Sequence, residues 1–267
     1  MLENVDLEQK LRKSIYKAQR PNLQRRLCAL QQTCMDSGLP AIIIFEGWDA
    51  ADKALVQKAL TQQLTPQSLV IHDIQPPRTY ETLMPWLWRF WLKIPRYGEM
   101  AIFYHSWYEH ILRERVESSL SRQDLSKAYR DITNFERALA DDGCVIIKLF
   151  FHLSQEEQAR RLNEMESDPL SNWRVRPEHW ERHQRYGQYL TAIREMLKRT
   201  DASCAPWTVI AATNFRWACV TTLETVIARI ESALESRGVA LPAENTDGEP
   251  APEDTPGALL HAGEEGE

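Results

Sequence analysis

The stretch that most constrains the fold is a short apolar run that ends near a glycine. Residues 41–45 read Ala-Ile-Ile-Ile-Phe, and Gly47 follows two positions later. A brief run rich in β-branched residues, without polar alternation, indicates a strand that is buried on both faces. Such strands belong to parallel sheets whose faces are covered by helices. The run therefore predicts an α/β protein.

Four further apolar runs predict strands, and helical patterns lie between them. The strands are expected at 69–72, 100–104, 144–150 and 209–212. Helical periodicity is found at 52–64, 79–92, 108–122, 124–141, 155–167, 177–200 and 216–236, and at 6–37 as one or two helices around Pro21. Strands that alternate with helices predict βαβ units, hence a parallel sheet of about five strands flanked by helices.

The charge of the chain is unevenly distributed. Residues 241–267 contain eight acidic residues and no lysine or arginine, and they are rich in Pro and Gly, so we expect a disordered acidic tail. Without this tail the net charge changes from −6 to +2. A mildly basic body is compatible with an anionic ligand, although a charge this small is equally compatible with no role.

Cysteine usage and the N-terminus narrow the class of protein. The five cysteines are irregularly spaced without a CxxC pair, which argues against a disulfide framework or a zinc site. The first residues are acidic and carry no apolar signal core, and no apolar run approaches the length of a membrane span. We expect a cytoplasmic protein without membrane or nucleic-acid partners.

The loop after the first strand has the spacing of a phosphate-binding loop. Such loops combine a strand, Gly-x-x-x-x-Gly-Lys and a helix, because glycines let backbone N–H groups approach the anion and the lysine reaches the terminal phosphates. Here Gly47 is followed after four residues by Asp52 and Lys53, but Asp52 replaces the second glycine and Ala54 replaces Ser or Thr. The alternative is a plain strand–turn–helix connection that Asp49 or Asp52 caps.

Asp52 would place a carboxylate where phosphate oxygens belong. Two like charges about 4 Å apart repel by roughly 1 kcal/mol in water and about 4 kcal/mol at an effective dielectric of 20. Its Cβ also obstructs the positive φ that glycine accepts, although Asp reaches that region more readily than most residues. The loop alone leaves both readings open.

A series of motifs in order along residues 10–235 resembles the polyphosphate kinase type 2 family. The matching segments are Phe45-Glu46-Gly47-Trp48-Asp49-Ala50-Ala51, Gly98-Glu99 with Ala101-Ile102-Phe103, Ser106-Trp107-Tyr108, Glu114-Arg115-Val116, Asn134-Phe135-Glu136, Lys148 to Ser154, Glu156-Glu157-Gln158, Asp168-Pro169, Trp173-Arg174, and Thr200 with Ala205-Pro206-Trp207. Together they are far more specific than any one of them.

The resemblance implies a P-loop kinase-like (thymidylate-kinase-like) fold with a helical lid. It divides the chain into an N-terminal helical segment at 1–40, a P-loop kinase-like domain at 41–240 with a lid at about 108–127 and 165–195, and the tail at 241–267. Members of the family transfer phosphoryl groups between inorganic polyphosphate and nucleoside mono- or diphosphates with Mg²⁺. They form dimers or tetramers, which implies a homo-oligomer here.

The resemblance also implies roles for particular residues. Asp49 would be the acid near the metal or the base toward the acceptor, and Lys53 would bind the transferred phosphoryl group. Arg115, also a candidate catalytic residue, would belong to the basic contacts of the lid. Phosphate or nucleotide would contact a larger set: Gly47, Ala50, Ala51, Asp52, Ala54, Arg78 and Arg174.

Several positions depart from the family pattern. Active members carry Asp-Arg before Ser-Trp-Tyr, where this chain has Tyr104 and His105, and they carry Asn-Arg after it, where this chain has Glu109 and His110. These changes remove an acid suited to magnesium and arginines suited to phosphate. Because phosphoryl transfer depends on positioning and charge neutralisation, we expect weak or absent activity.

Three functions remain open. The chain could be an active phosphotransferase that uses substitute groups. It could be a non-catalytic protein that binds polyphosphate or nucleotide, or that regulates an active paralogue, for which family members with two fused domains are an analogy. A different small-molecule kinase with a remodelled site is the third alternative.

Overall fold

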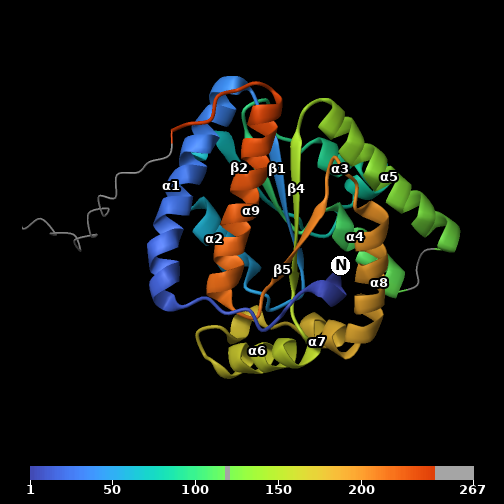
Figure 1. The fold of residues 1–267 in the computed structure, drawn as a ribbon. Helices are drawn as coiled ribbons and strands as arrows, with labels where there is room; N and C mark the ends of the chain where they lie inside the picture. Colours follow the sequence, from blue (N-terminus) through green and yellow to red (C-terminus); the bar gives the residue numbers. More distant parts are fainter. Residues whose placement is uncertain (118–120, 244–267) are drawn as a thin grey trace, which may run out of the picture.

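A parallel five-stranded sheet forms the centre of the computed structural model, which describes residues 1–117 and 121–243 (Figure 1). The strand order is β2-β3-β1-β4-β5. The strands are β1 (Ala41–Gly47), β2 (Leu69–Asp73), β3 (Met100–Tyr104), β4 (Val145–His152) and β5 (Trp207–Ala211). The predicted α/β class with a P-loop kinase-like parallel sheet is confirmed.

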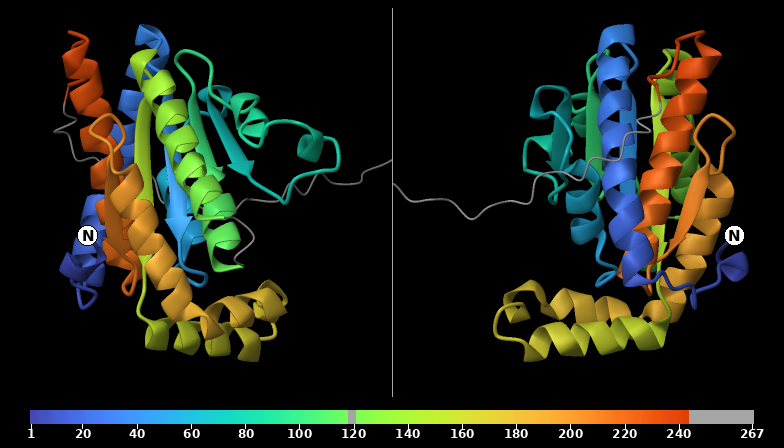
Figure 2. Two further views of the ribbon diagram at one scale, coloured as in Figure 1. Left: turned by 90° about the vertical axis from the view of Figure 1, so that its right-hand side faces the viewer. Right: turned by 60° about the vertical axis from the view of Figure 1, so that its left-hand side comes forward.

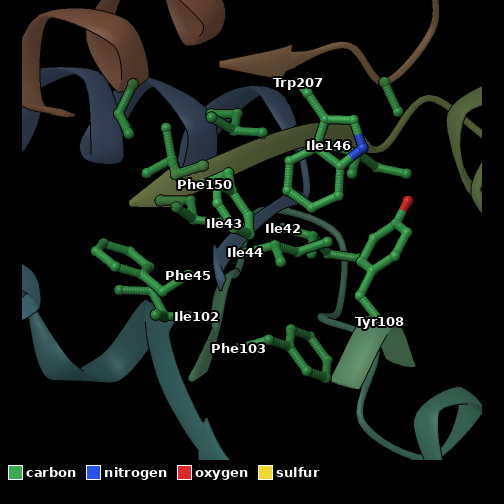
Figure 3. Packing of buried hydrophobic residues seen from close by; sticks show 14 of the residues in the cluster. Ile42, Ile43, Ile44, Phe45, Ile102, Phe103, Tyr108, Ile146, Phe150 and Trp207 are labelled. Carbon is green, nitrogen blue, oxygen red and sulfur yellow. The ribbon is translucent and has the colours of Figure 1, made fainter. Parts of the chain in front are cut away.

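The apolar run that opened the sequence analysis is the middle strand. β1 pairs with β3 on one side, where Phe45 lies opposite Tyr104, and with β4 on the other, where Gly47 lies opposite Phe151. Its side chains from Ala41 to Phe45 have no solvent exposure. Figure 3 shows them packed among the apolar side chains of β3 and β4. A strand between two parallel neighbours and two helical layers needs apolar residues at every position.

Helices cover both faces of the sheet (Figure 2). α1 (Lys13–Ser37), α2 (Lys53–Thr61) and α9 (Phe215–Ser236) pack against one another on one face. α4 (Trp107–Val116), α5 (Arg122–Asp141) and α8 (Tyr186–Thr200) form the layer on the other face. Among the described residues, no helix combines the length and apolar character that crossing a membrane requires.

Two helices lie across the end of the sheet where the strands finish. α6 (Gln155–Ser167) begins directly after β4, and α7 (Pro177–Gln184) follows a 3₁₀ turn, η4 (Asn172–Arg174). Figures 1 and 2 show α6 and α7 as a platform under the carboxyl ends of the strands. α7 falls within residues 165–195, for which the resemblance implies a lid, whereas α6 lies almost wholly before them. Ligands of open α/β sheets bind at this edge.

Some local expectations were wrong. The helix expected at 79–92 is a short turn, η3 (Glu81–Leu83), and one turn of helix, α3 (Trp88–Trp91), because Pro85 interrupts the segment. The helix expected at 177–200 divides into α7 and α8 at Arg185. α1 continues through Pro21 as one helix, and it starts only at Lys13. Most of the predicted tail, 244–267, lies outside the described residues.

A buried ion pair connects the sheet with the second helical layer. Lys148 Nζ of β4 lies 2.8 Å from Glu136 Oε2 of α5, and the two side chains are 0% and 1% exposed. The lysine also donates to the Thr200 carbonyl at 2.6 Å. Glu136 Oε1 accepts from the Tyr108 hydroxyl at 2.5 Å and from Trp107 Nε1 at 3.1 Å. The network thereby joins α4, α5, β4 and the end of α8.

Removal of the lysine should destabilise the fold strongly, because it leaves the Glu136 carboxyl buried without its cation. We expect Lys148→Met to lower the free energy of unfolding by about 3–5 kcal/mol in urea titration. Adding Glu136→Gln should recover more than half of this loss. The control is Arg160→Met, which removes the surface ion pairs of Arg160 with Glu157 and Glu164 and should cost less than about 1 kcal/mol. Equal losses of unfolding free energy in Lys148→Met and Arg160→Met would contradict this role of the buried network.

Candidate phosphate-binding site

The loop after β1 begins where the backbones of β1 and β4 approach closely. Gly47 has φ 135°, and a Cβ at this position would lie 2.3 Å from the Phe151 carbonyl oxygen. The next residue, Trp48, donates its backbone N–H to that same oxygen at 3.1 Å. Only glycine fits this approach. The first glycine of the motif is therefore required by the fold, whether or not phosphate binds.

The rest of the loop has the turning conformation that a phosphate loop needs. Ala50 and Asp52 both adopt left-handed φ angles, 62° and 54°. Asp52 occupies the N-cap position of α2 without a side-chain capping hydrogen bond, so the alternative of an Asp-capped turn is not what holds the helix end. Lys53 is 4% exposed, and its Nζ donates to the Gly47 carbonyl at 2.7 Å. Burial lowers the pKa of Lys53, although Asp49, Glu46 and Glu109 oppose this.

Asp52 points toward an arginine of α6. Arg161 Nη1 lies 3.0 Å from the Asp52 carboxylate and also donates to the Ala50 carbonyl at 3.0 Å. The same guanidinium donates to the Ala212 and Thr213 carbonyls at 2.9 and 2.8 Å and pairs with Glu157 at 2.7 Å. The carboxylate that we expected among phosphate oxygens thus has a counter-ion within the protein, which it shares with Glu157. Burial still raises the pKa of Asp52, and Arg161 counteracts it.

Asp49, the acid of the first motif, faces an arginine of α7. Arg182 Nε lies 2.9 Å from Asp49 Oδ2, yet its N–H makes no hydrogen bond there. Nη1 of the same arginine lies 3.8 Å from Glu109 Oε1 on α4. Glu109 in turn lies 3.3 Å from Nδ1 of His105. Arg182 therefore lies between the carboxylate of Asp49 in the loop and that of Glu109 on α4. Glu109 follows the second motif, which comprises residues 104–108.

The second motif lies beside the loop because β3 pairs with β1. Lys53 Nζ lies 5.6 Å from the centre of the Tyr104 ring, within the range of a cation–π contact. Burial and the nearby carboxylate of Asp49 raise the pKa of the Tyr104 phenol to about 12. Burial and the charges of Lys53 and Arg182 lower the pKa of His105 to about 2. Both side chains are therefore uncharged at neutral pH.

A buried carboxyl group lies beneath the loop. Glu46 is 3% exposed, and its Oε1 accepts hydrogen bonds from the backbone N–H and the hydroxyl of Ser106, both at 2.7 Å. Burial raises the pKa of Glu46 to about 7, although Lys53 acts in the opposite direction. Ser106 is the N-cap of α4. Glu46 thus connects the phosphate loop to the start of α4.

The predicted site residues do not all meet. Gly47, Asp49, Ala50, Asp52, Lys53, Tyr104 and His105 gather at the edge, with buried Ala51 and exposed Ala54 adjoining them. Arg115 is exposed and pairs with Glu195 of α8 at 3.4 Å. Arg78 is exposed in the connection after β2, and exposed Arg174 stacks on Trp173.

The sequence did not identify the two arginines of α6 and α7 that face the loop. Arg161 and Arg182 lie more than a hundred residues from the loop, and nothing in their local sequence says which arginine of the segment faces it. Glu157, one helical turn before Arg161, belongs to a motif that was recognised, and this spacing was the available signal. Glu109 was noticed as a departure, but its pairing with Arg182 was not foreseen.

The residues present do not form a preorganised magnesium site. In the described part of the chain, no group of three or more His, Cys, Asp or Glu side chains is arranged to hold a metal. Asp49 is occupied by Arg182, and protonated Tyr104 stands where the resemblance expects an acid. Mg²⁺ prefers carboxylate and phosphate oxygens. The described residues therefore offer no ready-made cage for this metal, which in kinase sites is held by one or two carboxylates together with substrate phosphates.

The fold and loop define a phosphate-loop protein of the α/β kinase type, and comparison with known proteins identifies its family. The family model for Polyphosphate kinase 2 (PPK2) matches residues 10–238. A Rhizobium meliloti ADP-polyphosphate phosphotransferase 3 is 31% identical over 80% of this chain and 76% of its own length. The chain belongs to the polyphosphate kinase 2 family.

Two further relatives match this chain over only about half of their own length. A polyphosphate:AMP phosphotransferase of Pseudomonas aeruginosa is 34% identical over 87% of this chain, but the match spans only 47% of that relative. A polyphosphate kinase 2 crystal structure from the same species superposes with a TM-score of 0.84 at 34% identity, covering 88% of this chain and 50% of the other. The chain thus spans about half the length of these relatives.

The buried Glu46 gives a testable pH dependence. Its pKa is raised from 4.5 to about 7, so the folded protein keeps a proton that the unfolded chain releases. This group therefore favours folding below pH 4.5, and its contribution is lost as the pH rises through about 7. We expect the unfolding free energy of wild type, measured relative to Glu46→Gln, to fall from pH 5 to pH 8 in urea titrations. A difference that is independent of pH would contradict the assignment.

Proposed function

We propose that this chain binds the phosphate groups of polyphosphate or a nucleotide at the loop between β1 and α2, and transfers phosphoryl groups weakly or not at all. The observation that carries the proposal is the pairing of the loop carboxylates with arginines of α6 and α7. Asp52 pairs with Arg161 and Asp49 lies against Arg182. A phosphate chain would have to compete with these internal anions for positive charge.

The second motif supports the same conclusion. Phosphoryl transfer is accelerated by cations and donors that stabilise the transferred group, and each such group is worth orders of magnitude in rate. At this edge the chain presents uncharged Tyr104 and His105. Lys53 remains at the start of α2, with backbone N–H groups and the helix dipole beside it. These features favour anion binding over catalysis.

The direct assay mixes polyphosphate, Mg²⁺ and AMP, ADP or GDP with the protein. We expect turnover no greater than that of Lys53→Ala. The triple variant Asp52→Gly, Tyr104→Asp, His105→Arg restores the family residues, and it should gain polyphosphate or nucleotide affinity and about tenfold or more in rate. Clear turnover by the unaltered chain above the Lys53→Ala control would show that the site is active. No gain by the triple variant would contradict the proposed effect of the replacements.

Assembly with a second copy of the chain is a separate proposal, and it rests on a different surface. Seven large exposed apolar side chains fall within residues 71–97: Ile71, Tyr80, Leu83, Met84, Trp91, Leu92 and Tyr97. Much of this stretch projects beyond the sheet in Figure 2. Exposed apolar residues gathered in one segment are typical of protein interfaces. We propose that this segment contacts a second copy of the chain.

The assembly proposal is tested by mass in solution. We expect light scattering after gel filtration to give a dimer or tetramer, and Leu83→Ser with Leu92→Ser to shift the mass toward the monomer. Exposed Leu170→Ser, which lies outside the segment, is the matched control and should leave the mass unchanged. A monomeric wild-type protein would refute this surface as a contact between copies.

A further inference from the structure

The lid helix α7 is held to the protein without a buried side chain. None of its residues, Pro177 to Gln184, is buried, whereas α6 buries two side chains and α8 buries six. It lies across the carboxyl edge of the sheet (Figure 2). Elements with few buried apolar contacts open at low free-energy cost. The polar contacts of α7 therefore decide how often it separates from the loop.

Arg182 supplies the charged contacts between α7 and the edge. It lies against Asp49 of the loop at 2.9 Å and against Glu109 of α4 at 3.8 Å. A neighbouring contact, between His183 Nδ1 and Gln158 Oε1 at 2.9 Å, joins α7 to α6. The Arg182 side chain is 32% exposed, so a ligand can reach it.

The arginine of α6 is bound differently. Arg161 is only 11% exposed and donates to three backbone carbonyl oxygens besides its two carboxylate partners. Losing Asp52 would leave most of these bonds intact, so Arg161 fixes α6 in place. Within the described residues, the Arg182 guanidinium donates to no backbone carbonyl, and its position depends on the two carboxylates.

We propose that Glu109 competes with phosphate oxygens for Arg182 and holds α7 over the loop. Carboxylate and phosphate oxygens are alternative acceptors for a guanidinium. Glu109 replaces the asparagine that the family pattern has after Ser-Trp-Tyr, so this chain supplies an extra anion of its own. The inference rests on the proposed phosphate-binding function.

The contact between Glu109 and Arg182 should affect two measurable quantities, the opening of α7 and the affinity for a phosphate chain. A partly exposed ion pair changes an equilibrium by about two- to fivefold. A phosphate chain that reaches α7 must displace Glu109, which weakens its binding by that factor. Glu109→Gln removes the competing charge while keeping the shape of the side chain. It should therefore loosen α7 in the absence of ligand and strengthen the binding of a phosphate chain.

The first experiment measures hydrogen–deuterium exchange of the amides in residues 177–184 without ligand. We expect Glu109→Gln to speed exchange about two- to fivefold, and Arg182→Gln to speed it at least as much. The double variant should match Arg182→Gln alone, because Glu109 acts through Arg182. The control is Glu181→Gln, which removes an exposed charge from α7 itself. Unchanged exchange in Glu109→Gln, or an equal increase in the Arg182→Gln background, would overturn the proposal.

The second experiment measures tripolyphosphate binding by calorimetry. We expect Glu109→Gln to bind about two- to fivefold more tightly than wild type, with no such gain in the Arg182→Gln background. If tripolyphosphate binds no variant while the exchange results hold, the proposed phosphate-binding function fails and the contact between Glu109 and Arg182 stands. If tripolyphosphate binds all variants with equal affinity, the proposed competition between Glu109 and phosphate for Arg182 is refuted.

Discussion

The buried ion pair between Lys148 and Glu136 holds together the elements that position the site. It joins β4 to α5, and through Tyr108 and Thr200 it reaches the start of α4 and the end of α8. A charged pair with no solvent exposure must be satisfied by its neighbours, because an unpaired buried charge is costly. This requirement fixes where α4 begins, and hence where the segment after β3 meets the loop after β1.

The same network explains why the family could be recognised from the sequence. Tyr108, Glu136, Lys148, Thr200 and Trp207 belong to the motifs that carried the resemblance, and all of them are buried. These motifs specify the packing of a polyphosphate kinase 2 fold. The strands were predictable for a related reason, since a buried parallel strand requires an uninterrupted apolar run. The segment at 79–92 was not, because its aromatic residues suggested a helix that Pro85 prevents.

The candidate site was predictable only in part. The loop from Gly47 to Lys53 and its neighbours at 104 and 105 are contiguous motifs at the ends of adjacent strands, so topology alone brings them together. The partners of the loop carboxylates come from α6 and α7, and long-range pairing of one arginine among many leaves no local pattern. The pairing of Asp52 with an arginine of α6 was therefore not foreseeable from the sequence. Its carboxylate faces Arg161, which it shares with Glu157.

The central claim is that the loop keeps a phosphate-binding shape while internal carboxylates occupy Arg161 of α6 and Arg182 of α7. A crystal structure of the chain with tripolyphosphate tests it most directly. The account predicts a phosphate within hydrogen-bond distance of Lys53 Nζ, with Arg182 turned from Asp49 and Glu109 toward the ligand. Tripolyphosphate bound away from the loop, or bound there with both Arg182 contacts intact, would contradict it.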